Sequence, residues 1–381
     1  MNAVGVSSSV SPFPDAAEAQ EKMDPTIASA VEKEKAGAAK TAKLVEPKSF
    51  SEKSFSQYII DLCAAGRHRA AENYYLKNVR QLLDSKINGK EKLNHLIYLP
   101  RIIQSGGGTK HGYQKLRIKA AGVERAIKGL ALPKGGAFIE LGCGAHDPLA
   151  LPTYFYLNGF EPCYGIDLLP PRTEYYSALS MYDICVNVRA FPRFYARPGV
   201  EPKDVLPRLK PFHLTRFEQG SLAGGFGAAS DKIKFLQEDI CQADIKKESC
   251  SLIVSFAVLE HVTDIARVAQ TLYDLLLPGG VVYHFVDLAD HRSYRGDGAF
   301  GPLSFLADEV APPNMNRLRA PQITEAHVAA GFEILRDSRE SVEMPDEILK
   351  NLQPRFREFS PEDVSVIKQS LILRKPGIPR A

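Results

Sequence analysis

The segment IELGCG, residues 139–144, is an apolar stretch that ends in two closely spaced glycines. The residues from Ala137 to Leu141 predict a short buried strand. Gly142 and Gly144 fall where this strand must turn sharply, and glycine allows the backbone both to turn and to approach a ligand closely. The segment therefore predicts the first strand of an α/β sheet, followed by a ligand-binding loop.

Strand-like and helix-like segments alternate after this loop. Further strands are predicted at 162–166, 233–236, 252–256 and 281–286, with a closing antiparallel pair at 331–335 and 366–373. Helices are predicted at 149–157 and from Ile265 to the PGG at 278–280. Such alternation is typical of parallel strands joined by right-handed crossovers. The expected fold is α/β: a Rossmann-like, seven-stranded, mostly parallel sheet with helices on both faces.

The chain divides into three parts by composition. Residues 1–48 contain few large apolar side chains and predict a disordered tail. Residues 49–130 show helical spacing and predict a helical N-terminal extension, and residues 131–381 form the α/β domain. Two stretches, 168–232 and 288–330, are too long for simple connections. Both leave the sheet at carboxyl ends of strands, so we expect them to form a substrate lobe.

Charge and apolar content exclude several classes of protein. Lysine plus arginine number 48 against 45 acidic residues, and a net charge of +3 argues against a nucleic-acid partner. No apolar run approaches the roughly 20 residues of a membrane helix, and no secretory signal is evident. The expected setting is cytoplasmic, and the composition leaves the oligomeric state open.

The six cysteines lie far apart and form no CxxC pair, which predicts reduced thiols rather than disulfides or a zinc site. A Glu260-His261 pair offers two metal-binding side chains, but no further ligands stand at a suitable spacing. We therefore expect no metal.

Acidic residues follow the next two strands. Asp167 ends YGIDL, where a carboxylate can accept hydrogen bonds from both ribose hydroxyls. Asp239 in FLQEDI is placed to bind the amine of an adenine, with Ile240 packed on the ring. Asp147 occupies the position where a dinucleotide fold wants a third glycine, and it would repel a pyrophosphate. Each acid alone can equally be a solvated residue at a strand end.

The ordered motifs IELGCG, YGIDL, FLQEDI, SFAVLEHV and LLLPGG resemble those of class I S-adenosylmethionine-dependent methyltransferases, over roughly residues 115 to 290. The resemblance implies S-adenosyl-L-methionine as the cofactor. It further implies that Gly142 and Gly144 flank the methionine part, Glu140 supports its ammonium group, Asp167 holds the ribose, and Asp239 and Ile240 frame the adenine. Residues 145–148 depart from the family pattern, because many members carry another glycine there.

Methyl transfer from a sulfonium is an in-line displacement, so the protein mainly orients the reactants, and a base serves only an acceptor that must lose a proton. His261, after the fourth strand, is the candidate base. The alternative is that Glu260 and His261 begin the next helix and brace the fold. His291 and Arg317 are predicted to orient the acceptor.

Other polar residues of the two insertions can grip an acceptor or simply face solvent. In the first insertion these are Tyr175, Tyr176, Arg189, Arg193, Tyr195 and His213, and in the second they are Asp287, Arg292, Tyr294, Arg295 and Asn316. The leading hypothesis is a methyltransferase acting at oxygen or nitrogen of a small-molecule or glycan-type substrate. The alternatives are a protein or RNA methyltransferase, or a non-catalytic methyltransferase-like binding or assembly module.

Overall fold

A computed structural model describes most of the chain from residue 112 onward and parts of the N-terminal region. The described residues are 46–47, 49–51, 54–55, 58–59, 61–62, 68–85, 112–144, 147–171, 174–295, 299–310, 312 and 314–377. The predicted disordered tail, 1–48, falls outside these residues except for 46–47.

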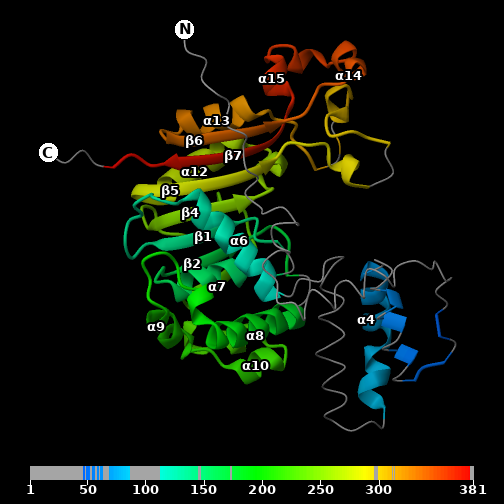
Figure 1. Cartoon of the computed structure of the whole chain (residues 1–381), viewed down its shortest axis with the longest axis vertical. Helices are drawn as coiled ribbons and strands as arrows, with labels where there is room; N and C mark the ends of the chain where they lie inside the picture. The colour runs from blue at the N-terminus through cyan, green and yellow to red at the C-terminus, as the bar shows by residue number, and fades with distance from the viewer. Residues whose placement is uncertain are drawn as a thin grey trace.

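Seven strands form one mixed sheet (Figure 1). They are β1 (Ala137–Leu141), β2 (Cys163–Ile166), β3 (Ile233–Leu236), β4 (Cys250–Phe256), β5 (Leu276–Asp287), β6 (Glu333–Ser341) and β7 (Val366–Arg374). The order is β3-β2-β1-β4-β5-β7-β6. The first five strands pair in parallel, and β7 is antiparallel to both β5 and β6. This confirms the predicted α/β fold.

Helices precede, connect and flank the strands. They are α4 (His68–Asp84), α6 (Gly112–Ala126), α7 (Ala150–Leu157), α8 (Glu174–Ala190), α9 (Pro202–Val205), α10 (Leu214–Glu218), α11 (Leu222–Phe226), α12 (Ile265–Leu275), α13 (Ala320–Ala329), α14 (Asp346–Lys350) and α15 (Pro361–Val364). Short 3-10 turns include η4 (Leu259–His261), η5 (His291–Arg295) and η6 (Ser304–Leu306). Among the described residues, no helix is both long and apolar enough to cross a bilayer.

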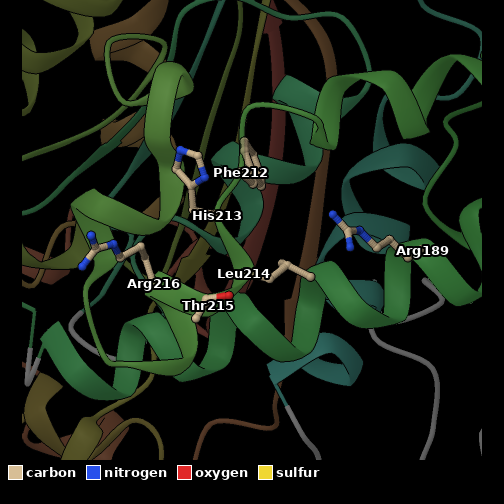
Figure 2. Close-up of a pocket in the computed structure, with 6 residues that line it drawn as sticks. All are labelled: Arg189, Phe212, His213, Leu214, Thr215 and Arg216. Atoms are coloured by element: carbon tan, nitrogen blue, oxygen red, sulfur yellow. The ribbon is translucent and has the colours of Figure 1, made fainter.

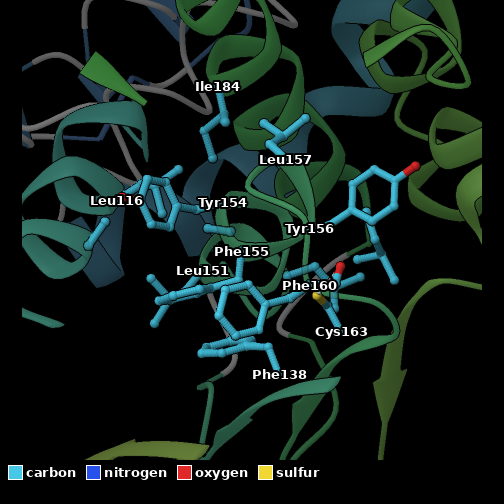
Figure 3. Close-up of a cluster of buried hydrophobic side chains, with 14 of the residues drawn as sticks. Leu116, Phe138, Leu151, Tyr154, Phe155, Tyr156, Leu157, Phe160, Cys163 and Ile184 are labelled. Atoms are coloured by element: carbon cyan, nitrogen blue, oxygen red, sulfur yellow. Dashed lines mark hydrogen bonds between the residues drawn. The ribbon is translucent and has the colours of Figure 1, made fainter. Parts of the chain in front are cut away.

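Alternate residues of β1 pack on opposite faces of the sheet, because side chains in a strand point alternately to either side. Phe138 stacks on Phe155 of α7, with ring centroids 4.0 Å apart, in a core that also includes α6 and α8 (Figure 3). Its neighbour Ile139 packs instead in the core that holds Leu272 of α12 and Ile323 of α13. Both faces are thus covered by helices, as the continuous burial of β1 requires.

The boundaries of β5 and β6 differ most from those predicted. Helix α12 ends at Leu275, and the Pro278-Gly279-Gly280 segment belongs to β5. The reason is tertiary: Gly279 N–H donates to the carbonyl of Lys375 over 2.9 Å, and Lys375 N–H donates to the Gly280 carbonyl over 3.0 Å. Pairing with β7 likewise extends β6 to Ser341, through a polar stretch that alternation of apolar residues does not mark.

The first insertion packs mainly on the α6–α7 face of the sheet. Residues from α8, α10 and α11 share the core of α7, for example Ile184, Phe217 and Phe226. In Figure 1 these helices lie below the β2 end of the sheet.

The second insertion, residues 288–330, consists of two parts that its sequence did not distinguish. Helix α13 is the crossover between β5 and β6, so only the part before it is additional. That part shares a small separate core with the β6–β7 connection, whose contribution the sequence did not reveal. The core consists of Ala289, Leu303, Phe305, Leu306, Leu352, Phe356, Val364 and Ile367. Figure 1 shows α14 and α15 beside this segment, at the end of the sheet away from α8.

Candidate functional site

The loop after β1 turns through two glycines with left-handed backbone conformations. Gly142 has φ of 65°, and a Cβ there would lie 2.2 Å from Cγ2 of Val258, so no larger residue fits. Gly144 has φ of 80°, but no described residue lies within 4 Å of the position of its absent Cβ. The loop is thus packed against the end of β4 on one side and open at Gly144. An open glycine permits the close approach of a ligand to the backbone.

Asp167 directly follows β2, and both of its carboxylate oxygens are held by backbone amides. Gly144 N–H donates to Oδ2 over 2.8 Å, and Leu169 N–H donates to Oδ1 over 2.9 Å. Each oxygen retains a further lone pair. The carboxylate is therefore fixed in orientation and can still accept hydrogen bonds from a ligand.

The segment after β3 brings an acid and an apolar side chain to the same edge. Asp239 Oδ1 accepts a 2.9 Å hydrogen bond from Cys241 N–H, while Ile240 is buried in the core beneath α12. Because β3, β2 and β1 are neighbours in that order and parallel, their carboxyl ends meet at one edge of the sheet. Asp239, Asp167 and the glycine loop therefore lie along the same edge of the sheet.

Glu140, predicted to support a ligand ammonium, is 1% exposed and already has a cationic partner. Lys119 of α6 donates to its Oε1 and also lies 4.8 Å from the ring centroid of Phe256. Burial raises the pKa of Glu140, and the Lys119 ammonium opposes that rise. A buried carboxylate with a single partner retains acceptor capacity for a second donor. Lys119 was not predicted, since it lies 21 positions from Glu140 in the sequence.

The turn η4 carries Glu260 and His261 away from the end of β4. It begins after Ala257, whose φ of 53° is unusual for a residue with a side chain. Glu260 is 1% exposed, and within the described part of the chain neither of its carboxylate oxygens has a hydrogen-bond partner. Burial, and then the nearby negative charge of Asp287, raise the pKa of Glu260 to about 8. Burying the Glu260 carboxyl group costs free energy unless a cation or a hydrogen-bond donor compensates for its lost hydration.

His261 is exposed, and its Nδ1 bonds the backbone carbonyl of Asn314. Because a carbonyl oxygen only accepts hydrogen bonds, Nδ1 carries the proton in the neutral ring and Nε2 has a free lone pair. The His261 and His291 rings lie edge to face with centroids 5.1 Å apart. His261 can therefore act as a base or as a ligand through Nε2.

Asn316 ties the second insertion to η4. Its side-chain amide donates to the carbonyls of Leu259 over 2.6 Å and Val262 over 2.8 Å, and its backbone N–H donates to the Glu260 carbonyl over 2.8 Å. These bonds span both ends of the turn. Asn316 therefore positions Glu260 and His261.

His291 begins η5, just beyond β5, with its Nε2 at 3.9 Å from Oδ2 of Asp287. Tyr294 anchors that carboxylate, since its hydroxyl lies 2.9 and 2.7 Å from the two oxygens. One donor atom each from Glu260, His261 and His291 lies within 4.8 Å of the others. The fold thus assembles three side chains of the kind that bind metals, although the sequence analysis expected no metal.

Arg317, predicted to orient the acceptor, is 7% exposed and has φ of 58°. Its guanidinium donates to the carbonyl of Asp308 over 2.7 Å and lies 5.9 Å from the ring centroid of Phe356. These contacts tie the loop before α13 to the small core of the second insertion. A direct role toward an acceptor stays a prediction.

The polar residues of the first insertion gather elsewhere. A cavity of about 550 Å³ is lined by Arg189 of α8 and by Phe212, His213, Leu214, Thr215 and Arg216 (Figure 2). Figure 2 shows Arg189 on one side and the 212–216 segment opposite it. The lining includes none of the residues at the ends of β1, β2 or β4. Arg189 and His213 thus line a cavity separate from the glycine loop.

The whole arrangement is that of a known family. A family described as the methyltransferase domain matches residues 113–337, more than half of the chain, and this protein belongs to that family. Its strand order, its glycine loop and the acids that follow β2 and β3 are those expected for the class I S-adenosylmethionine-dependent fold. No protein of curated function matches the sequence significantly.

Several solved methyltransferases resemble the chain at low identity. An S-adenosylmethionine-dependent methyltransferase from Mesorhizobium loti is 15% identical, with a TM-score of 0.33, over 66% of this chain and 95% of that one. Haemonchus contortus phosphoethanolamine N-methyltransferase 2, in complex with S-adenosyl-L-methionine, is 13% identical, with a TM-score of 0.38, over 78% of this chain and 60% of that one. A Haloferax volcanii methyltransferase, in complex with the Trm112 activator, is 14% identical, with a TM-score of 0.35, over 68% and 90%. These similarities do not identify an acceptor.

Proposed function

We propose that this protein binds S-adenosylmethionine and transfers its methyl group to an oxygen or nitrogen of a small-molecule or glycan-type acceptor. The observation that carries the proposal is the alignment of the glycine loop, Asp167 and Asp239 at the ends of three adjacent parallel strands. Ligands of open α/β sheets bind at this edge.

The residues present fit the parts of this cofactor. The open side of Gly144 admits the methionine part close to the backbone. The carboxylate of Asp167, held by two amides, has lone pairs left for the ribose hydroxyls. Asp239 and Ile240 offer an acceptor and an apolar surface for the adenine, and Glu140 can share its charge between Lys119 and the ligand ammonium.

S-adenosylmethionine, when bound, supplies an electrophilic methyl group on a sulfonium. The chain's own task is then to orient an acceptor and to remove a proton where the acceptor carries one. The location of His261 supports this role, since η4 follows β4 directly after Val258, which packs on Gly142. The unprotonated Nε2 of His261 can take a proton from an acceptor hydroxyl or ammonium.

The near-neutral net charge of +3 supports a small acceptor over RNA, because RNA binding depends on an excess of positive charge. The clustering of His261, which follows β4, with Asp287, His291 and Tyr294 at the end of β5 supports recognition of a compact polar group.

Calorimetry should show binding of S-adenosylmethionine and of its demethylated product to the purified protein. Binding of NAD without either sulfur nucleoside would overturn the cofactor assignment. The acceptor class is tested with methyl-labelled cofactor, the protein and separated fractions of a cell extract. Label should enter the small-molecule or glycan fraction, whereas label confined to protein or RNA would contradict that class.

A further inference from the structure

We propose that Glu260, His261 and His291 form a binding site for one divalent first-row transition-metal ion beside the methyl-transfer site. Their three donor atoms, one carboxylate oxygen and two imidazole nitrogens, lie within 4.8 Å of one another. They come from two separate parts of the chain, the turn after β4 and the turn after β5. Two imidazoles and a carboxylate favour ions such as Fe²⁺, Co²⁺ or Zn²⁺ over Mg²⁺ and Ca²⁺.

The carboxylate of Glu260 is the strongest indication of a missing partner. It is 1% exposed, and neither oxygen has a hydrogen-bond partner among the residues that the structure describes, although its backbone is held firmly by Asn316. Buried polar groups without partners are rare in folded proteins, because each loses its hydration without compensation. A cation at this position would satisfy both oxygens.

His261 has the supporting contact that metal ligands show, and His291 lies close to a carboxylate. A ligating histidine usually donates its other ring N–H to a carbonyl or a carboxylate, which fixes its orientation and makes it a better ligand. His261 makes this bond to the carbonyl of Asn314. The Nε2 of His291 lies 3.9 Å from the carboxylate of Asp287, which Tyr294 holds in place. His261 therefore has one nitrogen supported and one available for an ion, and the Nε2 of His291 has no hydrogen-bond partner among the described residues.

The location connects this site with the acceptor, and this part of the inference rests on the proposed function. Val258, two residues before Glu260, packs on Gly142 in the loop that would hold the methyl donor. An ion here would bind an acceptor hydroxyl and lower its pKa. In the transfer, the hydroxyl proton leaves to solvent, the oxygen lone pair forms the O–C bond, and the electrons of the C–S bond stay on sulfur. The inferred substrate class is therefore an acceptor with a metal-binding hydroxyl.

Titration of the full-length protein, freed of metal by a chelator, with Co²⁺ tests the site directly. The visible absorption of Co²⁺ reports nitrogen and oxygen ligation, and Zn²⁺ serves as a competitor. We expect one tightly bound ion per chain, displaced by Zn²⁺ and not by an equal concentration of Mg²⁺. Glu260→Gln keeps the shape of the side chain, and His291→Ala removes a ligand from the other turn.

Support contacts alone contribute about 10–100-fold to metal affinity, so each variant should bind Co²⁺ at least about tenfold more weakly. His213→Ala and Glu333→Gln, both at exposed positions outside the cluster, should bind Co²⁺ as the unaltered protein does. The proposal is overturned if no stoichiometric ion binds, or if the cluster variants bind Co²⁺ unchanged. Should Glu260→Gln fail to fold, His291→Ala decides the question.

Cofactor calorimetry separates this outcome from that of the proposed function. Failure to bind S-adenosylmethionine would defeat the proposed function and leave a positive Co²⁺ titration standing. Cofactor binding without Co²⁺ binding would defeat the metal site and leave the proposed function standing.

Discussion

The backbone amide of Gly144 donates a 2.8 Å hydrogen bond to Oδ2 of Asp167, and this bond joins the loop after β1 to the end of β2. The loop and the acid are therefore placed as a unit before any ligand binds. Gly142 N–H reinforces the link by donating to the Ile166 carbonyl over 2.8 Å. Preorganisation of this kind lowers the entropy that a ligand must lose on binding.

Asp167→Ala should weaken binding of S-adenosylmethionine by about 1.5 to 3 kcal/mol, through loss of charge-assisted hydrogen bonds to the ribose. The change also removes the acceptor of the Gly144 N–H, so a small fall in melting temperature is expected. The main effect should be the loss of cofactor affinity. Calorimetry measures the first and differential scanning the second. Asp231→Ala, at an exposed position before β3, is the control. Unchanged affinity in folded Asp167→Ala would remove this residue from the site.

The two glycines of the loop should respond differently to alanine. Gly142→Ala places a Cβ 2.2 Å from Val258, so it should lower the stability of the fold, and additional truncation of Val258 to alanine should recover part of the loss. Gly144→Ala meets no neighbour within 4 Å, and backbone strain costs it only about 1 kcal/mol. It should keep a near-normal melting temperature and lose cofactor affinity. Equal effects of the two changes on both measurements would contradict this division.

His261→Ala should lower kcat by about 100-fold or more, the usual contribution of a general base, with cofactor affinity unchanged. If His261 instead binds a metal ion, His261→Ala should cause a similar loss. In that case alone, a chelator should also slow the unaltered protein. The rate in the presence and absence of chelator therefore distinguishes the two roles. His213→Ala should retain the normal rate. Full activity of His261→Ala would leave orientation of the reactants as the mechanism.

Asn316→Ala removes the side-chain bonds to the carbonyls of Leu259 and Val262 and should cost about 1 to 3 kcal/mol of stability. Because these bonds position η4, kcat should fall while cofactor affinity and KM for the acceptor change little. Asn351→Ala, which removes an exposed amide directly after α14, is the matched control. If kcat is unchanged in folded Asn316→Ala, the η4 turn holds its geometry without this residue.

Acidification should destabilise the protein through His284 and His327, whose rings are buried 5.0 Å apart. Burial lowers the pKa of His284 well below 6.5 and that of His327 to about 4. Both rings stay neutral in the folded state, whereas the unfolded chain takes up protons below 6.5. Their contribution is therefore complete above that pH and is lost as the pH falls toward 4.

Unfolding by urea at about pH 7.5 and about pH 5 measures this effect, which should amount to about 1 to 3 kcal/mol for His327. His327→Leu removes the titrating ring and should reduce the dependence on pH, while His213→Leu should not. An unaltered pH dependence in folded His327→Leu would show that other groups cause the acid sensitivity.

The strands and their order along the chain follow from the sequence by itself. Ala137–Leu141 and Ile233–Leu236 are predicted to the residue, because short apolar runs bounded by turn residues are local signals. Gly142, Gly144 and Asp167 were named as candidate ligand-binding residues from the same local signals. Their approach to one another was expected because strand ends in a parallel sheet meet at one edge. The predicted boundaries were wrong where pairing with strands distant in the sequence sets the end of an element, as at the start of β5.

The second half of the site was decided by tertiary structure. His261 and Asn314 are 53 positions apart, and Asn316 lies 57 positions from Leu259, so no local pattern records these bonds. Burial of Glu260 without a partner, and its approach to His291, likewise depend on how two turns pack against each other. Sequence periodicity reports the environment of a residue along its own helix or strand. Contacts between separate loops arise only when the whole chain has folded, and they determine which charged groups lose water and face one another.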